Sequence, residues 1–152
     1  MFALLLLSVA VVLGLSVWFA ASAAAPRLQH RWGLDPSRAG WLTSLVQLGF
    51  VAGTLTAAVL NLADIVPGRR YFSTSTAAAA LANAALLVVP DYGWALVSRF
   101  ATGFFLAGVY PPAMKMAATW FRAGRGLAIG TVVGALTLGK STPYLVDVFG
   151  GA

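Results

Sequence analysis

The chain has 152 residues, of which 60% are hydrophobic and only 9% are charged, and its mean hydropathy is +0.86. A water-soluble domain carries about 25% charged residues, so this composition excludes one. The absence of cysteine excludes disulfides and thiolate chemistry, and the single histidine, His30, argues against a zinc site, so we expect no metal and no cofactor.

A formal net charge of +6 would suggest a nucleic-acid partner if the chain were soluble. Here the basic residues lie mostly between apolar runs, where they orient a protein in a membrane. We therefore expect a lipid bilayer as the partner, and no nucleic acid.

Five apolar segments each come close to the ~20 residues that a helix needs to cross a bilayer. They are residues 2–25, 40–62, about 71–90, about 93–118 and about 126–146. Because lipid cannot satisfy backbone N–H and C=O groups, such segments must be helices. The sequence therefore predicts an all-α, polytopic membrane bundle, with residues 1–152 forming one N-terminal domain.

The first segment has a second interpretation as a cleaved secretory signal, since the small residues ASAAA follow its Leu-rich centre. No Lys or Arg precedes it, and its uncharged run is long for a signal core. We therefore favour a retained first helix.

The second segment has two distinct faces. Asp35 and Pro36 offer an N-cap and an early-turn proline just before it. Gln47 leads a polar stripe along one face, and it either contacts a substrate or bonds helices together. Gly49 and Gly53 form a GxxxG roughly opposite, which allows a neighbouring helix to approach closely.

The stretch NLADIVPGRRYF, residues 61–72, reads as a short connection on one face of the bilayer. With the next connection on the same side, it carries more positive charge than the opposite side. The positive-inside bias therefore places this side in the cytoplasm. The basic residues are Arg69, Arg70, Arg122, Arg125 and the nearby Lys115 on this side, against Arg27, Arg31 and Arg38 on the other.

The fourth segment places Arg99, Gly103 and Tyr110 within a narrow arc, before Pro111 and Pro112 interrupt its hydrogen bonding and predict a kink. A charge at mid-depth costs at least ~2.5–3.5 kcal/mol, so Arg99 is a candidate for substrate binding or coupling. Tyr110 is either a packing residue or a substrate contact.

The fifth segment carries Lys140 at a depth that matches Arg99, roughly 10 Å below the outer boundary. The two cations would attract an anion, unless Lys140 only extends its side chain to the interface. Gly126, Gly130 and Gly134 form a doubled GxxxG, which predicts tight helix packing on one side.

LNLADIVPGRR resembles the loop signature between helices two and three of the major facilitator superfamily. SRFATGFFLAGVYPPAMKMAATWFRAGRGLAIG resembles that superfamily's fourth helix, with an arginine and a following glycine, and GLDPSRAGWLTS agrees with its entry to helix two. The branch with nitrate/nitrite porters and cyanate permeases looks most similar. The resemblance implies that the loop motif, which stabilises the outward-open state, consists of Asp64, Gly68, Arg69 and Arg70.

The resemblance also implies a fold of twelve helices, of which this chain would hold about five. The expected function is transport of a small anion or organic compound by alternating access, coupled to a proton or another ion, in the cell (inner) membrane. The C-terminal helices would then be partners, and the fragment alone would be inactive. A non-transporting membrane scaffold is the alternative. An enzyme is not expected, because the segments hold no acid pair, no GxSxG and no histidine.

Overall fold

The computed structural model describes residues 2–23, 25–121 and 124–150, with the side chains of residues 136–150 described only in part. The described residues form helices and no strand, which confirms the all-α prediction. In chain order the elements are α1 (Phe2–Ala23), α2 (Ala25–Trp32), α3 (Pro36–Val59), α4 (Leu62–Ile65), α5 (Gly68–Ala84), the 3-10 turn η1 (Ala85–Leu87), α6 (Tyr92–Leu106), α7 (Tyr110–Trp120) and α8 (Arg125–Gly150).

Aspartate caps fix the start of two of the long helices. The side chain of Asp35 accepts a hydrogen bond from the backbone N–H of Arg38 at 2.9 Å, and α3 begins at Pro36. Asp91 accepts from the N–H of Trp94 at 3.1 Å at the start of α6. Because the cap satisfies N–H groups outside the apolar run, α3 begins four residues before the segment expected from hydropathy.

The expected fourth span, 93–118, is divided into α6 and α7. The N–H of Gly108 bonds to Phe105 O and that of Val109 bonds to Leu106 O, both at 3.0 Å, so the chain tightens into a turn. Pro111 and Pro112 have no N–H to donate to the carbonyls one turn earlier. The break therefore lies just before the two prolines.

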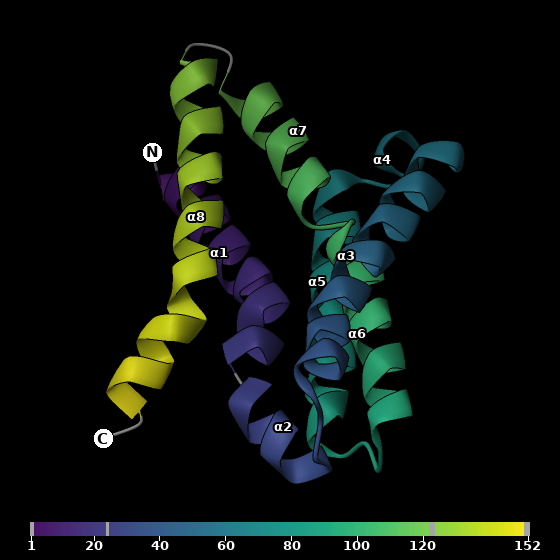
Figure 1. Ribbon diagram of the computed structural model, residues 1–152. Coiled ribbons are helices and arrows are strands. Elements are labelled where there is room, and N and C mark those ends of the chain that lie inside the picture. Colours follow the sequence, from purple (N-terminus) through teal and green to yellow (C-terminus); the bar gives the residue numbers. More distant parts are fainter. Residues whose placement is uncertain (1, 24, 122–123, 151–152) are drawn as a thin grey trace.

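Figure 1 shows two groups of helices. One contains α3, α5 and α6, and the other contains α1 and α8, with α7 leading from the first group to the second. Packing is most extensive between α3 and α6 and between α1 and α8. A hydrophobic core that includes Val11, Ala113 and Val132 joins α1, α7 and α8.

Three glycines lie in the contact between α3 and α6. A methyl group on Gly103 would overlap Val46 O, and methyl groups on Gly49 and Gly53 would overlap the carbonyl oxygens of Phe100 and Phe104. The two backbones therefore touch at positions where no other residue fits. Gly126, Gly130 and Gly134 of α8 have no described atom within 4 Å of such a methyl group, so their packing role stays a prediction.

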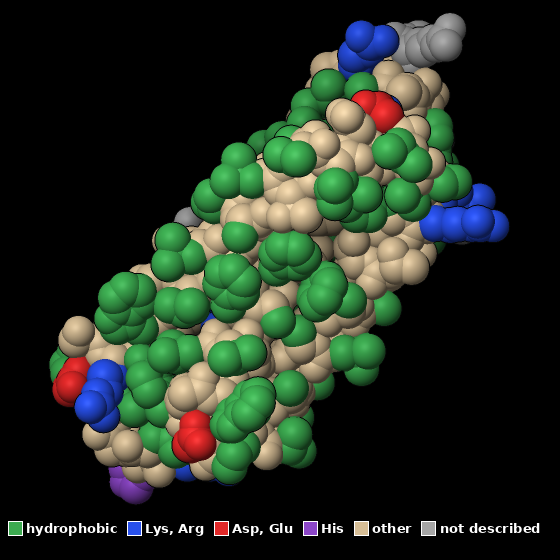
Figure 2. All heavy atoms as spheres, turned by 90° about the vertical axis from the view of Figure 1, so that its right-hand side faces the viewer, with side chains coloured by type: hydrophobic (Ala, Val, Ile, Leu, Met, Phe, Trp, Pro, Cys, Tyr) green, Lys and Arg blue, Asp and Glu red, His purple; other side chains and the backbone are tan. Residues whose placement is uncertain are grey.

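The outer surface is hydrophobic between two polar ends. Figure 2 shows charged side chains gathered at the two ends of one face, with mostly hydrophobic side chains between them. On α3, large apolar residues such as Leu48, Val51 and Leu55 are exposed. Among the described residues, one helix is long and apolar enough to cross a membrane, Pro36–Val59, and only 22% of its apolar window is buried. So little burial argues against the core helix of a soluble protein.

We predict that Gly103→Leu lowers the melting temperature of the protein in detergent, because the added side chain meets the backbone of α3. Overpacking of this kind costs about 1–3 kcal/mol. Gly130→Leu is the matched control, since the space around Gly130 is open and the residue is exposed. Equal melting temperatures for the two variants would contradict the close contact.

Candidate functional site

The most buried cation of the described chain is Arg99, whose side chain is fully enclosed. Its Nε donates to Leu42 O at 3.2 Å, its Nη1 to Asn83 Oδ1 at 2.8 Å, and its Nη2 to Trp18 O at 2.7 Å. These three acceptors belong to α3, α5 and α1. Arg99, Leu42, Asn83 and Trp18, here called the Arg99 cluster, thus connect three helices to α6.

Two hydroxyl groups beside the Arg99 cluster are satisfied by backbone oxygens. Ser98 Oγ donates to Ala82 O of α5 at 2.5 Å, and Thr102 Oγ1 donates to Ser98 O at 2.8 Å. Both hydroxyls therefore have acceptors for their protons apart from the Arg99 cluster.

The charge of Arg99 is not neutralised by any described carboxylate. The ion pairs among the described residues are Arg38–Asp35 and Lys115–Asp64, and neither includes Arg99. An arginine has five N–H donors, and the cluster accounts for three of them. The interior between α1, α3, α5 and α6 therefore holds a positive charge satisfied by neutral oxygens.

The other predicted substrate residues are not gathered around Arg99 in the described contacts. Gln47 is exposed on α3, away from the glycine face. Tyr110 is half-buried at the start of α7, packed against the core of α1, α7 and α8. Lys140 lies in α8, and its side chain is outside the described part of the chain. For all three a substrate role stays a prediction.

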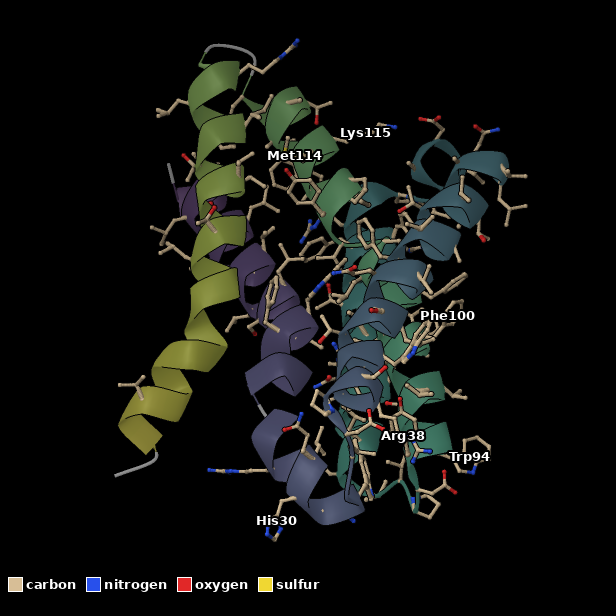
Figure 3. All side chains as sticks on the ribbon, viewed as in Figure 1. His30, Arg38, Trp94, Phe100, Met114 and Lys115 are labelled. Carbon is tan, nitrogen blue, oxygen red and sulfur yellow. The ribbon has the colours of Figure 1, made fainter. Side chains whose placement is uncertain are left out.

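A second polar site lies at the end of the bundle formed by α4, the start of α5 and α7. Lys115 Nζ lies 2.5 Å from Asp64 Oδ1 and also donates to Ala63 O at 2.8 Å. Figure 3 shows Lys115 at this end, on the side of α7 that faces α4. A cleft of about 420 Å³ adjoins the pair and is lined by residues of α4, α5 and α7, including Arg69 and Gly68.

Of the loop-motif residues, Asp64 belongs to this pair, and the other three lie near it without joining it. Gly68 begins α5, and a methyl group there would lie 3.5 Å from Met116 Cγ of α7. Arg69 and Arg70 are exposed and belong to no ion pair of the described residues. Lys115 is the ion-pair partner of Asp64 that the sequence analysis did not assign, although its place on the same side of the membrane as Asp64 was a usable signal.

No group of three or more His, Asp or Glu side chains that could hold a metal occurs among the described residues. The described contacts of the two polar sites are hydrogen bonds and one ion pair. One is a buried cation between α1, α3, α5 and α6, and the other is an exposed ion pair at one end of the bundle.

Comparison of the sequence with known proteins identifies one family. Residues 6–142 match the Major Facilitator Superfamily. The chain is also 30% identical over 119 residues to the "Niacin transporter NiaP" of Acinetobacter baylyi, an alignment that covers 78% of the chain and 27% of the relative. The chain thus spans about a quarter of the length of that relative. No solved structure shows a significant match.

We predict that Arg99→Leu destabilises the protein, because Leu42 O, Trp18 O and Asn83 Oδ1 each lose the described donor. A hydrogen bond to a charged group contributes about 1.5–3 kcal/mol. Thermal unfolding in detergent should therefore show a lower melting temperature than for Arg125→Leu, in which the replaced arginine is exposed. If both variants melt like the unmodified protein, the cluster does not hold the helices together.

Proposed function

Because the chain belongs to the major facilitator superfamily, we propose that it forms the first helices of a transporter that moves a small solute across the cell (inner) membrane by alternating access. Membership of the family makes the protein an integral membrane transporter rather than an enzyme. The match to NiaP supports transport of a small molecule. Coupling of transport to the gradient of a proton or another ion is part of this proposal.

The proposed substrate class is a small organic or inorganic anion. The observation that carries this proposal is the uncompensated charge of Arg99, held in the interior without a described carboxylate. In surroundings of low dielectric constant such a charge acts over a longer distance than in water. Niacin, named for the NiaP relative, carries a carboxylate and fits this class. The resemblance to nitrate/nitrite porters and cyanate permeases stays a prediction within the same class.

A complete substrate cavity would need helices beyond those described. Transporters of this kind place the substrate between two related halves near the middle of the membrane. Gln47, exposed on the polar face of α3, is proposed to face that cavity, as are Tyr110 and Lys140. The remaining helices of the same transporter are thus the proposed partners of this domain.

The Asp64–Lys115 pair is proposed to favour one conformation of the transporter. Both side chains are largely exposed, at 72% and 50%, so the pair adds little to the free energy of unfolding. A weak contact between two elements can still shift an equilibrium between states of similar free energy. Because α7 is separated from α6 by the break at Ala107–Val109, Lys115 lies on a different helix from Arg99.

We predict that cells producing the complete transporter with Arg99→Gln take up less labelled niacin or related small acid, because the interior cation is lost. Asn83→Ala is the matched control, since it removes one hydrogen bond of the cluster and keeps the charge. The measurement is the initial uptake rate against substrate concentration, normalised to the amount of protein in the membrane.

A rise in KM for Arg99→Gln that Asn83→Ala does not share would support an electrostatic role. Equal loss in both variants would show that the cluster acts only through packing. The 152 residues alone should give no uptake, and uptake at the rate of the complete protein would contradict the two-halves proposal.

We further predict that the charge reversal Asp64→Lys slows uptake and that the swap Asp64→Lys with Lys115→Asp restores most of the rate. The reason is that attraction returns when the two charges are exchanged. Arg38→Gln, which removes an exposed pair at the other end of the bundle, should leave the rate unchanged. A swap no faster than the single reversal would show that this pair does not set the conformation.

A further inference from the structure

A groove of about 480 Å³ opens between α1, α5 and α7, at the end of the bundle that carries α4. Its walls are mostly hydrophobic side chains from all three helices. Leu6 of α1 and Trp120 of α7 line it and are about half exposed, at 53% and 49%, while Phe72 of α5 and Met116 of α7 form its floor. Among the described residues of the lining, Arg69 is the one that carries a charge.

The charge of Arg69 lacks a counter-ion among the described residues. The acid of this end, Asp64, is already paired with Lys115 at 2.5 Å. The capping residues Asp35 and Asp91 lie at the opposite end, where α3 and α6 begin. Arg69 therefore offers its donors to whatever enters the groove.

The bilayer supplies a molecule with both of the required properties. Exposed hydrophobic walls are suited to acyl chains, and a Trp near a helix end is typical of the membrane–water interface. The guanidinium group binds phosphate through two parallel hydrogen bonds, which makes arginine well suited to a lipid headgroup.

We propose that the groove binds one anionic phospholipid, with an acyl chain between α1 and α5 and the phosphate on Arg69. An anionic headgroup is favoured over a zwitterionic one because the described lining offers Arg69 to a phosphate and no acidic side chain to an ammonium. A lipid is favoured over free phosphate because most of the lining is hydrophobic.

The site adjoins the ion pair described above. Arg69 lines both the groove and the cleft beside Asp64 and Lys115. A phosphate held on Arg69 would place a negative charge next to that pair. The lipid would then stabilise the arrangement of α4, α5 and α7 in which Arg69 faces the groove.

Native mass spectrometry of the purified protein in detergent, titrated with phosphatidylglycerol or phosphatidylcholine, tests this site. The unmodified protein should retain one phosphatidylglycerol in preference to phosphatidylcholine. Arg69→Gln should weaken the binding of phosphatidylglycerol about tenfold, the effect of losing a charged hydrogen-bond pair. Arg125→Gln is the matched control, because Arg125 is exposed and outside the groove lining.

Three results would overturn the proposal. The first is unchanged retention of phosphatidylglycerol in Arg69→Gln. The second is an equal loss in Arg125→Gln, which would show diffuse attraction to basic residues. The third is displacement of the lipid by excess inorganic phosphate, which would show a site for the free anion. Retention of phosphatidylglycerol in the presence of phosphate, lost only in Arg69→Gln, would support a lipid site.

Discussion

The cost of enclosing the Arg99 guanidinium constrains the arrangement of the helices around it. A charge in the middle of a membrane costs at least ~2.5–3.5 kcal/mol unless other groups solvate it. Here the solvating groups are oxygens of Leu42, Asn83 and Trp18, which come from three helices. The hydrogen bond from Arg99 to Leu42 O needs α3 to lie close to α6. Gly103, one turn beyond Arg99, allows this because it has no side chain to meet the backbone of α3.

The two polar sites have different physical characters and suit different tasks. The Arg99 cluster is fully buried, so its hydrogen bonds gain strength from the low dielectric constant and hold one arrangement. The Asp64–Lys115 pair is exposed, so water and salt weaken it and it can form and break at little cost. The break before Pro111 separates the segment that carries Lys115 from the segment that carries Arg99. A transporter needs both a fixed interior and contacts that change between states.

The sequence was sufficient for the class of fold and for several helix starts, because these depend on local chemistry. Hydropathy required helices, and the aspartates at 35 and 91 marked where two of them begin. The acceptors of Arg99 could not be predicted from the sequence, since two of them are backbone carbonyls, which every residue possesses. Which face a GxxxG presents was equally hidden. Gly49 meets α6, whereas Gly130 meets open space, and only the three-dimensional arrangement separates the two cases.

Hydrogen–deuterium exchange of arginine Nε–H groups, followed by NMR with the protein in bilayers, tests the enclosed guanidinium most directly. The Nε–H of Arg99 should exchange far more slowly than those of Arg69, Arg70 and Arg125, which are exposed. Exchange of Arg99 at the rate of those three would place its side chain in water, and the arrangement of α1, α3 and α5 around it would have to be abandoned.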